Sequence, residues 1–179
     1  MKHIPTSTHY FANRTLQILV SDRAREGTGQ WATRAKVIKM CDLLPKYCLR
    51  PPQMTELGIS HDKYVTLLQS VPFVACAHGG GIDPSPKAWE AIMAGTIPIV
   101  QHSPLDDAYA QLPVAFVNSW EELLQPESEE KLASVLTRWI TELQPYYEVG
   151  SVLRTETLEV REKIKNDTYC SFVYAKHTC

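Results

Sequence analysis

The sequence lacks any apolar run long enough to span a bilayer, and its first residues, MKHIPTSTHY, lack the pattern of a signal peptide. It also lacks an excess of charge of one sign, because 18 Lys and Arg oppose 20 Asp and Glu to give a net charge of −2. This balance gives no electrostatic reason to expect nucleic acid or an acidic membrane as a partner. With 44% hydrophobic residues, the composition is that of a soluble globular protein.

Cysteines are few, odd in number and without the spacing of metal ligands: Cys41, Cys48, Cys76, Cys170 and Cys179. We therefore expect neither a disulfide framework nor a zinc site. Cys76 lies in an apolar run and is expected to be a small core residue. The length of 179 residues suits one domain with a real core and is short for two.

The most informative stretch is residues 71–100, VPFVACAHGGGIDPSPKAWEAIMAGTIPIV. It predicts a buried strand at 73–77, a glycine turn, a short helix and a second buried strand at 96–100. Ser85 is expected to cap the helix, Pro86 to occupy its first position and Gly95 to end it. A glycine turn before a helix N-terminus presents backbone N–H groups to an anion, so the turn and the helix start are candidate ligand-binding residues: Gly79, Gly80, Gly81, Ser85 and Pro86.

The spacing within this helix favours a ligand. One face carries a cation, a carboxylate and two alanines, at Lys87, Glu90, Ala91 and Ala94. The other face carries three large apolar residues that are expected to pack on a sheet, at Trp89, Ile92 and Met93. The cation suits a phosphate and the carboxylate suits ribose hydroxyls. The ordinary alternative is a solvated pair on a surface helix, but the adjacent glycine run and Ser-Pro start favour the ligand.

Secondary candidates surround this stretch. In the turn itself, His78 could contact a phosphate or a sugar and Asp83 could bind a sugar hydroxyl, although a loop histidine and a turn former are the plain alternatives. The loop after the first predicted strand carries three arginines within reach of a phosphate: Arg23, Arg25 and Arg34.

The rest of the chain alternates short apolar strands with helices. Strands are predicted at 16–20, 47–49 and 114–117, and helices at 30–44, 61–69, 128–143 and 152–166, with a capping box at Ser119 to Glu122 and a break at Pro145. This pattern predicts an α/β fold, a Rossmann-like parallel sheet with helices on both faces plus C-terminal helices. We expect a nucleotide-binding domain over residues 1–144 and a helical extension packed on it over 145–179.

Two enzyme classes are disfavoured by missing motifs. The run from His78 to Gly81 copies the oxyanion turn of some lipases, but the chain has no G-x-S-x-G nucleophile elbow. Gly27 and Gly29 form only a loose dinucleotide fingerprint, set several residues beyond the first predicted strand. The sequence therefore indicates neither a hydrolase of that kind nor a nicotinamide-dependent oxidoreductase.

Residues 64–124 resemble the nucleotide-sugar-binding half of glycosyltransferases with the B-type fold, and most resemble the exostosin-type group. In that group a strand and glycine turn precede a basic residue three positions before a Glu, followed by A-x-x-A-G-x-I-P-V-I. The matching positions are Lys87, Glu90, Ala91, Ala94, Gly95, Ile97, Pro98, Ile99 and Val100. Later elements also fit, at 112–114 and 120–123.

The resemblance implies transfer of a sugar from a nucleotide donor, expected to be UDP-linked, to a hydroxyl of a glycan or glycoprotein. Glu90 would hold the ribose and Lys87 would meet the pyrophosphate. The reaction is expected to be inverting and metal-independent, with the nucleotide sugar as donor substrate and no further cofactor. Consistent with this, Asp106 and Asp107 are adjacent and do not form a D-x-D motif. A carboxylate or a histidine is expected as general base, and no residue is assigned to that role.

The chain departs from the family in length, because B-type enzymes have two Rossmann-like domains. The acceptor domain and the base are therefore expected on a missing N-terminal domain or a partner chain. A non-catalytic nucleotide-sugar-binding module and a GDP-sugar transferase of the fucosyltransferase kind remain alternatives. The expected compartment is the Golgi lumen if the chain is a fragment of a type II membrane enzyme, and the cytoplasm otherwise.

Overall fold

The computed structural model describes residues 10–23, 26–51, 59–78, 85–123 and 129–166, with side chains up to residue 148. Its centre is a five-stranded parallel sheet with the strand order β2-β1-β3-β4-β5. The strands are short: β1 Ile18–Leu19, β2 Cys48–Leu49, β3 Phe73–Ala75, β4 Ile97–Gln101 and β5 Ala115–Val117. Four of them fall inside strands predicted from the sequence, and β4 extends one residue beyond the predicted strand at 96–100.

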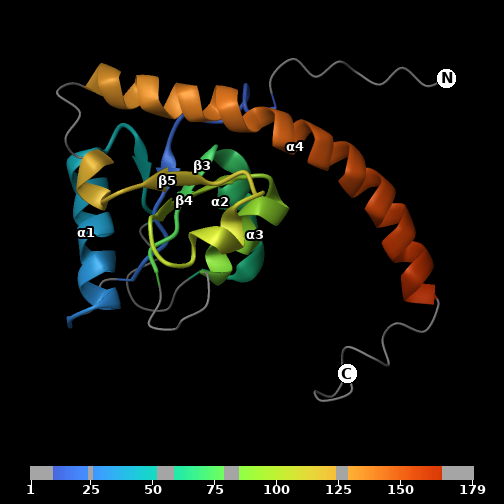
Figure 1. Cartoon of the computed structure of the whole chain (residues 1–179), viewed down its shortest axis with the longest axis horizontal. Helices are drawn as coiled ribbons and strands as arrows, with labels where there is room; N and C mark the ends of the chain where they lie inside the picture. Colours follow the sequence, from blue (N-terminus) through green and yellow to red (C-terminus); the bar gives the residue numbers. More distant parts are fainter. Residues whose placement is uncertain (1–9, 24–25, 52–58, 79–84, 124–128, 167–179) are drawn as a thin grey trace.

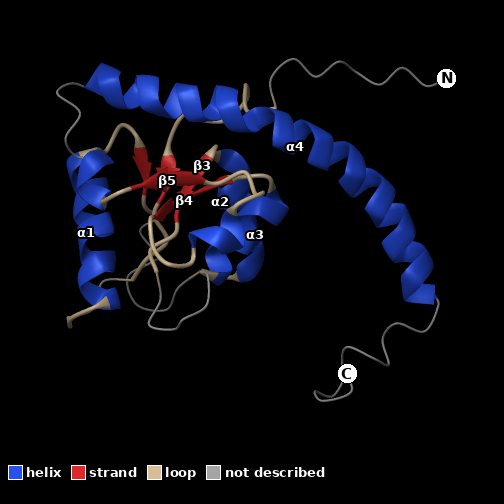
Figure 2. Cartoon of the chain, in the orientation of Figure 1, coloured by secondary structure: helices blue, strands red, loops and turns tan. Residues whose placement is uncertain are grey.

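Helices cover both faces of this sheet (Figure 2). They are α1 Gln30–Leu43, α2 His61–Ser70, α3 Pro86–Ala94 and α4 Glu129–Asn166, with short 3₁₀ turns η2 Asp106–Tyr109 and η3 Trp120–Leu123. The predicted α/β fold is confirmed: the chain is a Rossmann-like parallel sheet flanked by helices, with a helical C-terminal region.

Alternation along the strands divides the core into two layers, because successive strand residues point to opposite faces. One set packs with α1 and the first half of α4: Ile18, Val20, Phe73 and Ala75. The other set packs with α2 and α3: Leu19, Val74 and Cys76. All of these residues are buried, which explains why the strands are apolar throughout instead of alternating with polar residues.

Local signals set the ends of α2 and α3. The Ser60 side chain accepts a bond from the Lys63 N–H at the start of α2 (3.4 Å). Pro86 is the first residue of α3, and Gly95 ends it in the left-handed region with φ 77°. Ser85, however, makes no side-chain cap, so that part of the prediction is wrong; the residue is buried and its carbonyl accepts the Ala88 N–H.

The predicted capping box is also wrong in detail. Residues 120–123 form a 3₁₀ turn, and the Glu122 carboxylate reaches Asn118 instead of Ser119. Its two oxygens accept bonds from the Asn118 backbone N–H (3.0 Å) and side-chain amide (2.6 Å). A tighter turn shifts the register by one residue, and the asparagine amide offers a second donor there.

The predicted break at Pro145 is absent, since α4 runs unbroken from Glu129 to Asn166. Two residues further on, the buried Tyr147 hydroxyl donates to the carbonyls of Thr96 (2.9 Å) and Pro113 (3.0 Å). This anchoring holds the segment helical despite the lost N–H of proline. The division predicted between residues 144 and 145 therefore falls inside α4, which lies along the body over its first half and curves away over its second (Figure 1).

Cys41 and Cys48 form a disulfide, contrary to the expectation from the cysteine pattern. The connection from the end of α1 to β2 is short, so it returns Cys48 to within 5.2 Å of Cys41 between Cα atoms. Cys76 is free and buried, as expected. Among the described residues, all the helices are too polar or too short to form a bilayer-crossing segment.

Candidate functional site

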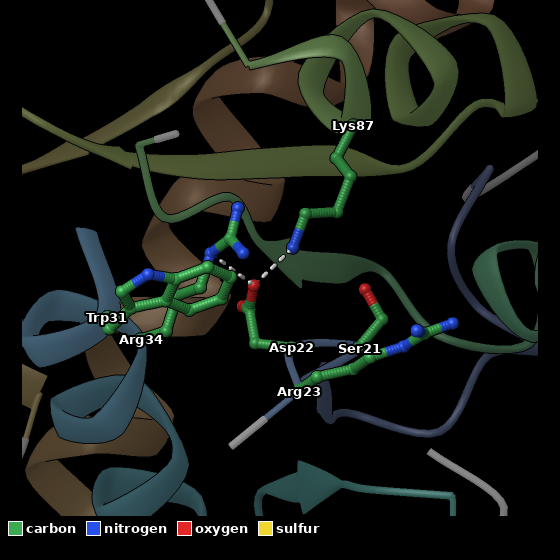
Figure 3. Close-up of a pocket in the computed structure, with 6 residues that line it drawn as sticks. All are labelled: Ser21, Asp22, Arg23, Trp31, Arg34 and Lys87. Carbon is green, nitrogen blue, oxygen red and sulfur yellow. Dashed lines mark hydrogen bonds and ion pairs between the residues drawn. The ribbon is translucent and has the colours of Figure 1, made fainter. Parts of the chain in front are cut away.

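A crevice opens where the chain leaves β1 and β3 in opposite directions. These strands are neighbours, but β1 leads to α1 on one face of the sheet and β3 leads towards α3 on the other. Ligands of doubly wound sheets bind at such switch points, outside the carboxyl ends of the strands. Here the structure has a cavity of about 310 Å³, lined by Ser21, Asp22, Arg23, Trp31, Arg34 and Lys87 (Figure 3).

Asp22 lies at the centre of this cavity. Its side chain is only 2% exposed, and its Oδ1 accepts a 2.6 Å bond from Lys87 Nζ and lies 3.6 Å from Arg34 Nε. Its Oδ2 is buried without a hydrogen-bond partner among the described residues. A carboxylate this deeply buried requires cations beside it. Asp22 therefore draws together one cation from α1 and one from α3, as Figure 3 shows.

Lys87 reaches the crevice from the first turn of α3, as expected for a phosphate-binding cation. Its ammonium has three N–H donors, and the bond to Asp22 uses one of them. The Lys87 side chain remains 22% exposed. The protein thus holds this cation extended into the cavity, with donors left for a ligand.

The α1 side of the cavity combines an aromatic ring with positive charge. The Arg34 guanidinium lies 4.8 Å from the centre of the half-buried Trp31 ring. Arg23 follows Asp22 directly and is exposed at the rim. The lining therefore carries three cations and one carboxylate, so the cavity as a whole favours an anion.

Glu90 lies one turn after Lys87 and is half-buried. Within the described part of the chain, its carboxylate makes no hydrogen bond or ion pair, and it does not line the cavity. Burial is the main cause that raises the pKa values of Tyr64 and Cys76, and the charge of Glu90 raises them further, so Glu90 lies near the side of the crevice formed by α2 and the end of β3. It is placed where a ligand extending from Lys87 along α3 would meet it.

The prediction that the large apolar residues of α3 pack on the sheet is wrong for Trp89 and Met93, whereas Ile92 is half-buried against the core. The placement of Ala91 on the ligand face is also wrong, because Ala91 is buried. Trp89 is 38% exposed and Met93 64%, whereas the sheet contact is made by Ala88 and Ala91, which are fully buried. Small residues let the helix backbone approach the sheet closely, and this places the start of α3 beside the crevice. Trp89 instead stacks on Tyr109, with ring centres 5.8 Å apart.

Two uncharged polar groups, Cys76 and Tyr64, lie buried near Asp22. Burial raises the pKa of the Cys76 thiol to about 12, and burial likewise raises the pKa of Tyr64. Ser21 lies close enough to the Tyr64 hydroxyl to lower its pKa in part, although the two make no hydrogen bond of ordinary geometry. Both groups stay protonated at neutral pH, so Asp22 carries the negative charge at this point.

The other predicted residues have mixed outcomes. His78, at the end of β3, is half-buried and its Nε2 lies 3.0 Å from the Gln101 carbonyl oxygen, to which it donates. Arg34 and Arg23 line the cavity, and their predicted contact with a phosphate stays a prediction. The remaining candidates lie outside the described residues: Gly79, Gly80, Gly81, Asp83 and Arg25.

Sequence reasoning missed three residues of the cavity: Ser21, Asp22 and Trp31. One signal for Asp22 was available, because a polar pair follows the apolar run LQILV directly and must lie at the carboxyl end of that strand. The position of Trp31 depends on the direction in which α1 leaves the loop, and no local pattern encodes that direction.

The topology and this cavity define the class of the protein as a Rossmann-like α/β domain with an anion-favouring cavity at the switch point of its sheet. Comparison with protein-family models and with curated proteins finds no match for the chain. Among the described residues, no group of three or more His, Cys, Asp or Glu side chains gathers in the manner of a metal site.

Proposed function

We propose that this chain is the donor-binding domain of a glycosyltransferase, which transfers a sugar from a nucleotide sugar to a hydroxyl of a glycan or glycoprotein. The donor is UDP-linked in this proposal, as in the exostosin-type enzymes that residues 64–124 resemble. The observation that carries it is the position of Lys87: the basic residue of the motif extends into a cationic cavity at the switch point.

The charge distribution supports a diphosphate. Lys87 approaches from the α3 side and Arg34 from the α1 side, so two cations converge on one point. The N-terminus of α3, beside Lys87, adds its partial positive charge. When the sugar leaves, negative charge builds up on the diphosphate, and fixed cations stabilise that charge in the transition state.

The remaining side chains supply contacts for the rest of the donor. The Glu90 carboxylate accepts hydrogen bonds from the ribose hydroxyls, while the Trp31 ring offers a flat apolar surface for a sugar or base. A cavity of about 310 Å³ is at the small end of ligand sites, which suits a domain that holds only part of the substrates. The acceptor is then held by a missing N-terminal domain or a partner chain.

Isothermal titration with UDP and with uridine tests the role of Lys87. Lys87→Met keeps the aliphatic stem and removes the charge, so UDP should bind about 10- to 100-fold more weakly, as for a lost charged hydrogen bond, while uridine is unaffected. Lys39→Met, an exposed lysine on α1, is the matched control and should bind UDP normally. Equal losses for UDP and uridine would show that Lys87 is structural.

Glu90→Ala tests the ribose contact. It should abolish the binding of both UDP and uridine, with the circular dichroism spectrum unchanged, because Glu90 is half-buried and makes no hydrogen bond within the described part of the chain. Undiminished UDP affinity in the folded variant would remove Glu90 from the site. Competition between UDP and GDP distinguishes the two donor classes, and a wild-type protein that binds neither refutes the proposed function.

A further inference from the structure

The carboxyl end of β4 carries a histidine and an aspartate in direct contact. His102 follows β4 immediately, and its Nδ1 lies 2.6 Å from Asp106 Oδ2. The other oxygen, Oδ1, accepts the Ser103 backbone N–H at 2.9 Å. These bonds from His102 and Ser103 hold the pKa of Asp106 below its usual value, so the carboxylate is ionised and both of its oxygens have a partner.

The imidazole ring is held in one orientation. It stacks on Phe116 of β5, with ring centres 4.8 Å apart and planes inclined by 11°. The His102 backbone N–H donates to the Val117 carbonyl at 2.9 Å, which extends the pairing of β4 with β5 by one residue. The backbone of His102 is thus hydrogen-bonded as part of the sheet, which fixes the position of the ring.

The contact with Asp106 also fixes the tautomer. An ionised carboxylate only accepts hydrogen bonds, so the proton of the neutral ring lies on Nδ1 and the lone pair on Nε2. The His102 side chain is 48% exposed, so a molecule outside the protein can approach the ring. An oriented imidazole with an orienting carboxylate and an accessible lone pair is the arrangement of a general base.

This pair lies on the same edge of the sheet as the cavity. Asp22 follows β1 and His102 follows β4, and only β3 separates these strands. At about 4.8 Å between neighbouring strands, the separation along the edge is roughly 10 Å, about the length of a diphosphate with its sugar. His78 stands between them and donates to the Gln101 carbonyl. Outside the pair itself, His78 is the ionisable group in the described part of the chain whose charge acts on Asp106.

We propose that His102 is the general base of the transfer and Asp106 its positioning residue. This rests on the proposed function and replaces the expectation that the base lies on another domain. His102 Nε2 takes the proton of the acceptor hydroxyl while the hydroxyl oxygen bonds to the anomeric carbon. The bond from that carbon to the diphosphate oxygen breaks, and its electron pair leaves with the nucleoside diphosphate. Asp106 stabilises the imidazolium, which then releases its proton to water.

A contribution to stability does not account for this arrangement. Exposed ion pairs four residues apart contribute little to folding and are weakened further by salt. A surface ion pair does not need a carboxylate with hydrogen bonds at both oxygens or a ring stacked at a small angle on an aromatic neighbour. Positioning of a base does require that order, because proton transfer depends on the direction of the lone pair.

The test uses the full chain and a panel of UDP-sugars, with water as acceptor and UDP release as the readout. His102→Gln should lower kcat by about 100-fold or more, with the affinity for UDP within twofold of wild type. Asp106→Asn should also lower kcat, because its amide donates to Nδ1 and forces the proton onto Nε2. Asp107→Asn, the neighbouring exposed acid, is the matched control and should leave kcat unchanged.

Chemical rescue separates a base from a structural residue. Added imidazole should restore turnover in His102→Ala and should have no effect on Lys87→Met. Three results would each overturn the assignment of His102 while leaving donor binding in place. They are an unchanged kcat in His102→Gln, a failure of imidazole to rescue His102→Ala, and wild-type protein that binds UDP but releases no UDP from any UDP-sugar. Wild-type protein that binds no nucleotide would overturn the proposed function, and this inference with it.

Discussion

Removing the disulfide between Cys41 and Cys48 should destabilise the protein by a predictable amount. The two cysteines are seven positions apart, and the loop-closure relation for a link of that length gives about 2.4 kcal/mol at 25 °C. A domain typically has only about 5–15 kcal/mol of stability in total. At about 2–4 °C per kcal/mol for a chain of this size, the melting temperature should fall by about 5–10 °C.

The assay is urea denaturation followed by tryptophan fluorescence, since Trp120 is buried in the core. Wild type and the double variant Cys41→Ala/Cys48→Ala are each measured with and without dithiothreitol. The reductant should lower the unfolding free energy of wild type to near that of the variant, and should leave the variant unaffected. The free Cys76 is common to both proteins, so it cancels in the comparison.

A second measurement tests directly whether Cys41 and Cys48 are linked, without reference to stability. A tryptic digest under non-reducing conditions should contain the peptides of residues 40–46 and 47–63 joined through their cysteines, because trypsin does not cleave between Arg50 and Pro51. Separate peptides with alkylated thiols, together with a denaturation curve insensitive to reductant, would show that the link does not form.

Two further predictions concern the core. Tyr147→Phe should lower the unfolding free energy by about 1–3 kcal/mol in thermal denaturation, because the carbonyls of Thr96 and Pro113 lose a buried donor. Tyr146→Phe, at an exposed position, is the control and should change the unfolding free energy by less than about 0.5 kcal/mol. Equal effects of the two substitutions would contradict the anchoring role of Tyr147. Burial raises the pKa of Cys76 from 9.0 to about 12, so its contribution is complete below pH 9 and is lost as pH rises towards 12. Wild type should therefore lose more stability between about pH 8 and pH 11 than Cys76→Ala, and parallel pH curves would refute this assignment.

Local sequence was sufficient for the elements of this fold. The strands were predictable because they are buried on both faces and therefore read as short apolar runs, such as the one around Val74. The ends of α2 and α3 were predictable because Ser60, Pro86 and Gly95 act on neighbouring backbone groups. These features depend on interactions within a few residues of each other along the chain.

Features that depend on distant segments were not predictable in this way. Asp22 gains its role only because β1 lies beside β3, which brings Lys87 to it from 65 residues away. Helix α4 continues through Pro145 because Tyr147 finds buried acceptors on other elements. The disulfide likewise depends on how the chain turns back after α1. In each case, packing between elements outweighs the local preference that the sequence displays.

Because α4 is unbroken, its second half extends from the body as a continuation of the same helix. Tyr147 fixes the helix to the body just beyond Pro145, and 19 helical residues follow it to Asn166. At 1.5 Å per residue this second half is roughly 28 Å long, so a change of about 10° in its direction beyond Tyr147 would displace its far end by roughly 5 Å. The anchor at Tyr147 therefore sets the angle at which whatever contacts the end of this helix is held relative to the crevice.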